Sequence, residues 1–142
     1  MEFEATGPRR AQFVVDLRLA DPYLYGGAVS TGALPVGSHA VAVIGDAASP
    51  RHTVTLTGPL TNPTVQVKAG ATVLSSMSYA GTIGSGQSLS VQFPSFVASG
   101  VSPAAVSADQ PWWVVLDPAA TQIEVGGSGS GSVTLSYQSA WL

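Results

Sequence analysis

The fold of this chain is decided around the run Thr57-Gly58-Pro59-Leu60-Thr61-Asn62-Pro63-Thr64-Val65-Gln66-Val67. Proline has no backbone N–H and fixes φ, and the residue before each proline is pushed towards an extended conformation. Two prolines so close together predict a rigid corner that neither a helix nor a central strand passes through. We expect one strand over 52–57 to arrive at this corner and another over 64–68 to leave it. Asn62, the only asparagine, can bond backbone groups and hold the corner.

Apolar and polar residues alternate on both sides of the corner. A period of two places each set on one face of a strand. The apolar sets are Phe13, Val15, Leu17 and Leu19; Val65 and Val67; Leu89, Val91 and Phe93; Ile123 and Val125; and Val133, Leu135, Tyr137 and Trp141. The clearest polar sets between them are Ser88, Ser90 and Gln92, and Ser132, Thr134, Ser136 and Gln138. Further extended segments are expected over 23–30, 39–44 and 72–79.

These segments amount to about 8–10 short strands divided by Gly and Pro, which predicts an all-β fold, an antiparallel β-sandwich or barrel with almost no helix. We favour the sandwich, as a single domain over residues 11–142, preceded by an N-terminal arm over residues 1–10. Ser102-Pro103 can begin one helical turn, with the serine as its cap. The glycine-rich run over 126–131 is interpreted as a flexible hairpin loop, because one strand follows it.

Charged residues are scarce. They make up 9% of the 142 residues, five basic and eight acidic, with a net charge of −3, whereas soluble domains average about 25%. A surface of Ser, Thr, Gly, Ala and Gln loses little on desolvation, which favours a subunit covered by other subunits, although an unusual soluble monomer remains an alternative. Arg9-Arg10 is the only basic pair, so we expect no direct nucleic-acid partner. No apolar run approaches ~18 residues, so we expect no membrane insertion.

The search for catalytic or metal-binding patterns is mostly negative. The chain has no cysteine, and His39 and His52 have no third ligand at a metal-binding spacing, so we expect both on the surface or in loops. Asp16 and Asp21 could form a carboxylate pair for glycoside hydrolysis. A solvated strand face for Asp16, and a turn before Pro22 for Asp21, are the simpler interpretations. We therefore expect no enzyme activity, no cofactor and no metal.

Trp112-Trp113 is the most informative aromatic pair. Neighbours on a strand point to opposite faces, so one indole can enter the core while the other faces outward, as an interface contact or a stacking platform for sugars. The alternative is that both are buried in a strand covered on two sides, which would suit the apolar Val114 and Val115 that follow. Trp141 is expected to pack in the core and tie down the last strand.

Three groups of residues carry a family resemblance. They are Gly45-Asp46-Ala47 with Pro50 and the run Thr55 to Pro63; Phe13 to Tyr25 with Asp21-Pro22 near its end; and Trp112 to Pro118 through Ile123, closing on Tyr137 and Ala140-Trp141. Together they resemble the C-terminal domain of siphophage distal tail proteins, above all those of phages that infect actinobacteria. The resemblance covers most of residues 11–142.

The resemblance implies a β-sandwich of galectin-like or jelly-roll type in a tail-tip or baseplate ring, with a structural role and no catalysis. It implies a place in the virion, at the tail tip, after synthesis in the host cytoplasm. The partners it implies are further copies of this chain and other tail proteins, namely the tail tube, the tail hub, the tape measure and the receptor-binding proteins.

One departure from the family bears on assembly. In longer members an N-terminal domain builds the central ring, whereas Met1 lies only about a dozen residues before Phe13. We expect this chain to be the sandwich half with a short arm, which decorates a ring made by another chain or forms one through the arm. Opposite charges at the two ends of the arm can set its orientation on a neighbour. The expected assembly interface comprises Phe3, Arg9, Arg10, Trp112 and Trp113.

Two function classes follow from the sequence. The first is a structural subunit of a phage tail tip, supported by the resemblance and by the scarcity of charge. The second is a carbohydrate-binding β-sandwich module for recognition of a host glycan, which outward aromatic side chains with polar neighbours on one sheet face would support.

Overall fold

The computed structural model describes residues 24–48, 51–93, 95, 97–108 and 117–141. The arm over 1–10, the strand expected over 13–19 and the Trp112-Trp113 pair lie outside the described residues, and so does the boundary expected between arm and domain. The described strands are β1 Leu24–Ser30, β2 Leu34–Pro35, β3 Gly37–Ala40, β4 His52–Thr57, β5 Leu60–Ala69, β6 Thr72–Tyr79, β7 Thr82–Ile83, β8 Ser88–Phe93, β9 Val97–Gly100, β10 Val106–Ala108, β11 Gln122–Ser128 and β12 Ser132–Trp141. One 3-10 turn, Pro103–Ala105, lies between β9 and β10.

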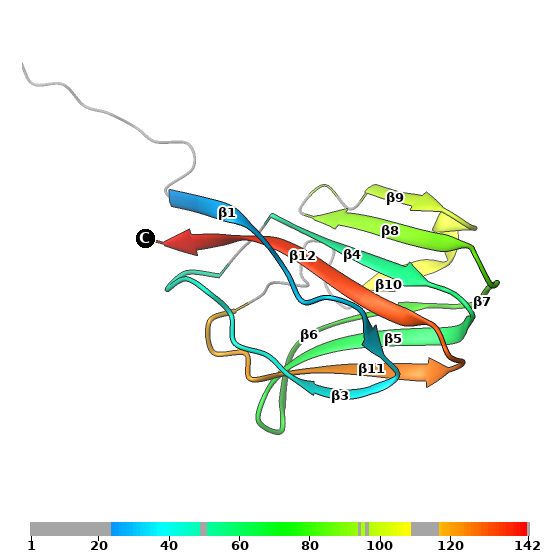
Figure 1. The fold of residues 1–142 in the computed structure, drawn as a ribbon, viewed down its shortest axis with the longest axis horizontal. Helices are drawn as coiled ribbons and strands as arrows, with labels where there is room; N and C mark the ends of the chain where they lie inside the picture. Colours follow the sequence, from blue (N-terminus) through cyan, green and yellow to red (C-terminus); the bar gives the residue numbers. More distant parts are fainter. Residues whose placement is uncertain (1–23, 49–50, 94, 96, 109–116, 142) are drawn as a thin grey trace, which may run out of the picture.

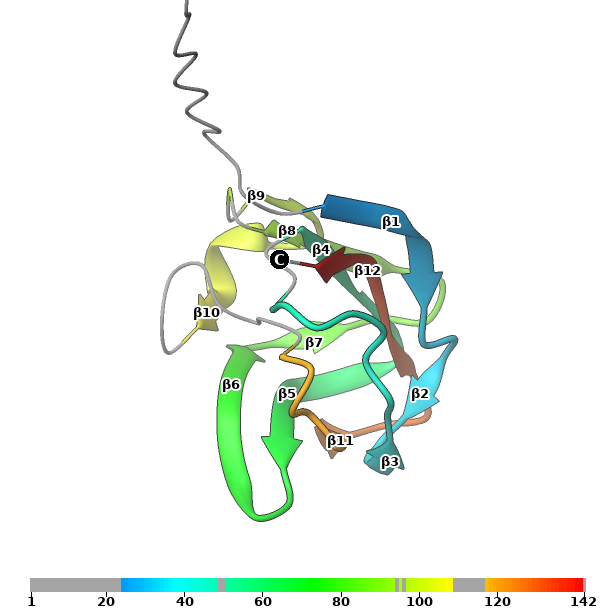
Figure 2. The same cartoon turned by 90° about the vertical axis from the view of Figure 1, so that its left-hand side faces the viewer.

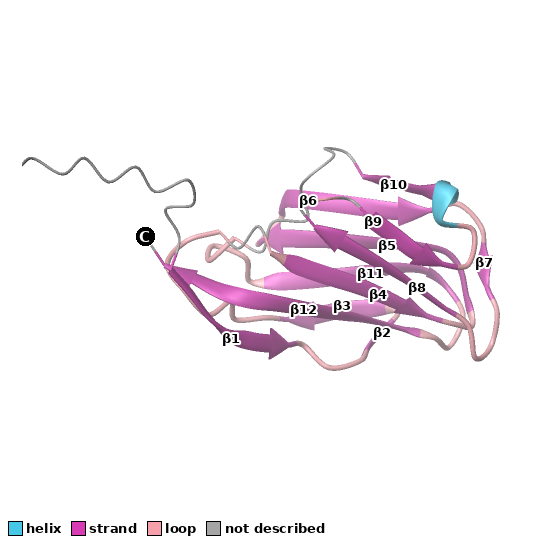
Figure 3. Ribbon diagram, turned by 90° about the horizontal axis from the view of Figure 1, so that it is seen from above, coloured by secondary structure: helices cyan, strands magenta, loops and turns pink. Residues whose placement is uncertain are grey.

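The strands form two sheets that pack face to face (Figure 1, Figure 3). Sheet A has the order β1-β12-β4-β8-β9, and β2 also pairs with β12. Sheet B has the order β10-β6-β5-β11-β3, and β7 also pairs with β5. All the pairings between these strands are antiparallel. The expected antiparallel β-sandwich is confirmed.

The core lies between the sheets and is built from the alternating apolar sets. Sheet A contributes Val54, Leu56, Leu89, Val91, Phe93, Val133, Leu135 and Tyr137, and sheet B contributes Leu60, Val65, Val67, Met77, Tyr79, Ile83, Ile123 and Val125. Most polar residues of the same strands face outward, with His52 of β4 and Ser75 of β6 among the exceptions. The alternation seen in the sequence therefore assigned the inner faces of β8, β11 and β12 correctly.

The sequence predicts Trp141 in the core, but Trp141 does not join it. It is half-buried at the end of β12, and its ring lies over Gly26 on the edge strand β1. A Cβ atom on Gly26 would stand 2.7 and 2.8 Å from two indole carbons. The side chain therefore ties β1 to the end of β12, while the core itself ends at Tyr137 and Ala140.

The predicted corner is correct at its first half and wrong at its second. β4 ends at Thr57, as expected, and the chain passes from sheet A to sheet B through the cis Gly58-Pro59 peptide. The next strand, however, begins at Leu60 and runs through Asn62-Pro63.

The strand tolerates Pro63 because the pairing of β5 is irregular there. Asn62 has a positive φ of 46°, and the register of β5 against β11 shifts between the pairs of Thr61 and Thr64. Asn62 is also held by Gly81, whose N–H donates to Asn62 Oδ1 (3.0 Å) and whose carbonyl accepts from the Asn62 N–H (2.8 Å). The asparagine thus bonds backbone, as expected, inside a strand instead of at a corner.

Residues 126–131 do not form a hairpin. β11 extends to Ser128 in sheet B, whereas β12 begins at Ser132 in sheet A, so this run is a second crossing between the sheets. The Gly131 N–H donates to the Pro59 carbonyl at 2.9 Å. The two crossings therefore pack against each other, backbone to backbone.

Two smaller expectations also need correction. The strand expected over 39–44 is β3, Gly37–Ala40, because its partner β11 begins at Gln122, the residue paired with Ala40. The helical turn after Ser102 forms, but Ser102 has a positive φ of 39° and its side chain makes no cap hydrogen bond.

Candidate functional site

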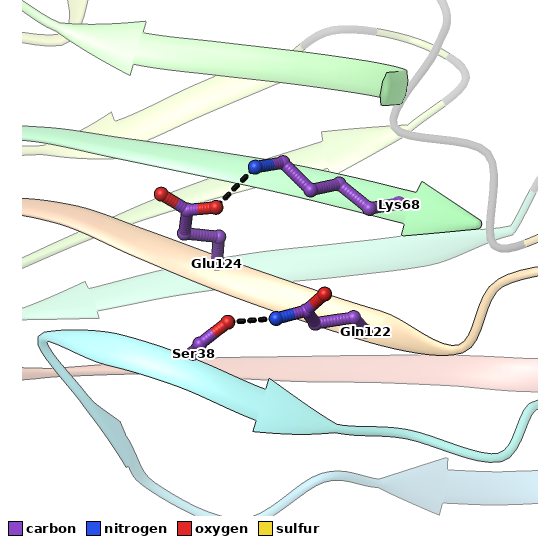
Figure 4. A network of polar contacts seen from close by, with 4 residues as sticks. All are labelled: Ser38, Lys68, Gln122 and Glu124. Carbon is purple, nitrogen blue, oxygen red and sulfur yellow. Dashed lines mark hydrogen bonds and ion pairs between the residues drawn. The ribbon is translucent and has the colours of Figure 1, made fainter. Parts of the chain in front are cut away.

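Two polar pairs lie on the outer face of sheet B. On its central strands, Lys68 of β5 forms an ion pair with Glu124 of β11 (Figure 4). Beside it, the Gln122 amide donates to the Ser38 hydroxyl of β3 (Figure 4). These four side chains are thus engaged in two pairs.

The outer face of sheet A carries short uncharged polar side chains in cross-strand rows. One row runs Ser30, Ser136, Thr53 and Gln92, across β1, β12, β4 and β8. The next row runs Thr134, Thr55, Ser90 and Ser99, across β12, β4, β8 and β9. Hydroxyl and amide groups therefore cover the face strand after strand.

A hollow of about 460 Å³ opens on this face where β4 begins and β8 ends. We call it the sheet A hollow; it is lined by Ala28, Arg51, His52, Thr53, Gln92, Phe93, Ser95, Ser136, Tyr137 and Gln138. The short side chains of Ala28, Thr53 and Ser136 stand among the longer ones of Arg51, Gln92 and Gln138. This difference in length leaves the hollow.

The three members of this row that line the hollow keep their hydrogen-bonding capacity unused. Within the part of the chain that the structure describes, the side chains of Thr53, Gln92 and Ser136 form no hydrogen bond. In the next row, by contrast, Thr55 Oγ1 and Ser90 Oγ are bonded at 2.9 Å. The three side chains can therefore donate to and accept from a ligand without breaking a bond in the protein.

An aromatic layer underlies the hollow on the core side. His52 is 3% exposed, and its ring stacks on Phe93 with centroids 4.7 Å apart and planes 13° apart. The expectation of a surface or loop position is thus wrong for His52, which shares the inward parity of Val54. His39 is half-buried on β3, with Nε2 2.7 Å from the Pro35 carbonyl oxygen.

At the rim of the hollow, the Arg51 guanidinium lies 4.1 Å from the centroid of the Tyr25 ring. A cation over an aromatic face is held by the negative potential of the ring. This contact fixes Arg51 at the side of the hollow, where it is the one charged residue of the described lining.

The described residues contain no group of three His, Asp or Glu side chains that could hold a metal ion. No helix among them is long and apolar enough to cross a membrane. The predicted interface residues Phe3, Arg9, Arg10, Trp112 and Trp113 lie outside the described residues, as do Asp16 and Asp21.

The sequence identified outward residues but not their meeting point. Gln92, Ser136 and Gln138 were assigned to polar faces by alternation, which is confirmed. Their position around one hollow depends on the register of β12, β4 and β8. That register pairs Thr53 with Gln92, 39 positions away, and with Ser136, 83 positions away, and periodicity in the sequence does not contain it.

Comparisons with known proteins show a likeness in fold. The chain matches no protein-family model and no curated protein sequence. Its fold is similar to that in the crystal structure of the phage SPP1 Dit (gp 19.1) protein, whose title calls it a paradigm of the hub adsorption apparatus in phages that infect Gram-positive bacteria. The TM-score is 0.65 at 20% sequence identity. The match covers 87% of this chain and 50% of that one, so this chain spans about half the length of the Dit structure.

Proposed function

We propose that this chain is a structural subunit of the tail tip of a siphophage or a related particle, where it forms or decorates a ring at the distal end of the tail tube. The observation that carries the proposal is the match of 87% of the chain to the fold of a phage hub protein. The proposed partners are copies of itself and the tail tube, hub, tape-measure and receptor-binding proteins. The role is one of assembly, without catalysis.

The surface chemistry supports a subunit that other subunits cover. Charged residues make up only 9% of the chain, and interface cores are depleted of charge. A ring then requires one heterologous contact, repeated until it closes.

The β5–β6 hairpin is the described segment best suited to such a contact. It extends beyond the neighbouring strands of sheet B (Figure 2). Residues 70–74 at its tip are all exposed, and they include Val73 at 45% and Leu74 at 37%. Covering exposed apolar side chains such as these with a neighbouring subunit removes them from water, which favours association.

The experiment is a comparison of particles that carry Leu74→Glu or Val36→Glu. Val36 is also 37% exposed, so the two variants add the same charge at equal exposure. We expect immunogold to label the tail tip of normal particles, and mass spectrometry to show far less of the Leu74→Glu chain than of the Val36→Glu chain. Normal incorporation of the Leu74→Glu chain would refute the hairpin contact. If purified particles lack the chain altogether, the tail role fails.

A further inference from the structure

We propose that the sheet A hollow is a binding site for a neutral saccharide. Its volume of about 460 Å³ lies in the range of small-ligand sites, about 300–1,000 Å³. The hollow is thus matched to a small molecule or to the end of a glycan chain.

The lining selects the class of ligand. Thr53 and Ser136 present hydroxyl groups, and Gln92 presents an amide, so each offers both a donor and an acceptor. Sugar hydroxyl groups have the same double character, and they can satisfy all three side chains at once. Carboxylates are absent from the described lining, and Arg51 lies over Tyr25, so the site carries little charge to attract an ion.

Apolar surface at one side of the hollow suits the C–H groups of a sugar ring. Ala28 of β1 lines the hollow beside Gln138, its partner on β12. A ring seated at this side would place C–H groups on Ala28 and hydroxyl groups towards Ser136 and Thr53.

Sheet B provides the internal comparison. Its outer face also carries amide, hydroxyl and charged groups, but Gln122 bonds Ser38, and Lys68 bonds Glu124. A ligand over these pairs would first have to break their contacts, whereas Thr53, Gln92 and Ser136 form no side-chain hydrogen bond among the described residues. The hollow and these three side chains together place the proposed site on sheet A.

The test uses the full chain labelled with ¹⁵N and titrated with maltose, lactose and N,N′-diacetylchitobiose, each to about 20 mM, the range of a weak site. We expect shifts of the amide signals of Ala28, Thr53, Gln92, Ser136 and Gln138 with at least one sugar. Thr53→Val removes one hydroxyl and should weaken binding about threefold to tenfold, the loss of one neutral hydrogen bond. Ser136→Tyr fills the hollow and should abolish binding.

Thr134→Val is the matched control. Thr134 lies on the same outer face of β12 as Ser136, one row away, and it does not line the hollow. It should bind as the unaltered chain does. The inference is overturned if none of the three sugars shifts these signals, if the shifts lie elsewhere, or if Thr134→Val weakens binding as much as Thr53→Val. Each of these results leaves the tail role intact, because particle incorporation is measured separately.

Discussion

Gly131→Ala tests whether the two crossings between the sheets depend on each other. A Cβ atom at residue 131 would collide with the Thr57 carbonyl oxygen, and would stand 2.7 Å from Leu60 Cγ and 2.9 Å from the Pro59 carbonyl oxygen. Real Cβ atoms do not approach other heavy atoms below 3.0 Å, so the backbone of one crossing must move. That movement also disturbs the hydrogen bond from the Gly131 N–H to Pro59.

The size of the effect follows from these contacts. Forcing one extra carbon into a packed interior costs about 1–3 kcal/mol, and weakening the hydrogen bond adds about 1 kcal/mol. We therefore expect the free energy of unfolding to fall by about 2–4 kcal/mol. For a domain of about this size each kcal/mol lowers Tm by about 2–4 °C, so Tm should fall by about 4–16 °C.

Urea unfolding followed by circular dichroism measures this change. Gly27→Ala is the control, because a Cβ atom there would meet no heavy atom within 4 Å and Gly27 has no positive φ. We expect it to lie within about 0.5 kcal/mol of the unaltered chain. The packing of the crossings is refuted if Gly131→Ala is as stable as Gly27→Ala.

Four further outcomes are expected. Leu135→Ala, at a site with 0% exposure, should lower the free energy of unfolding by about 2–5 kcal/mol in urea titrations; a loss below about 1 kcal/mol would contradict its place in the core. Glu124→Gln breaks a partly exposed ion pair and should cost less than about 1 kcal/mol, a cost that 1 M salt reduces; a larger, salt-independent loss would contradict this. Deletion of residues 1–10 should leave the circular dichroism spectrum unchanged and abolish incorporation into particles; normal incorporation would refute the role of the arm. EDTA should leave Tm unchanged, and a fall in Tm would reveal a structural metal.

Alternation predicted the strands whose two faces differ. β4, β6 and β8 fall over the expected residues 52–57, 72–79 and 88–93. Their buried and exposed sides differ because the core lies on one side only. His52 shows the same rule overriding a residue preference: it shares the parity of Val54 and is buried, although histidine is more often exposed.

The sequence could not show which sheet each strand joins. The glycine-rich run over 126–131 suits a hairpin and a crossing equally well, because glycine permits both backbones. The crossing is set by the contact of Gly131 with Pro59, which lies 72 residues away. The prediction that no strand passes through Pro63 failed for a similar reason. The irregular pairing that accepts this proline involves β11, which is distant in sequence.

The candidate site was the least predictable part. The expected interface residues lie outside the described residues, and the hollow is formed by Thr53, Gln92 and Ser136, which look ordinary in sequence. Such residues gain a shared role only when the register of three strands brings them together.

A density map of the intact particle tests the tail-tip role most directly. The proposed function predicts density at the distal end of the tail tube, repeated around the tail axis, into which sheets A and B fit as a pair. A map in which the ring proteins account for all the tail-tip density, with no place for this sandwich, would contradict it.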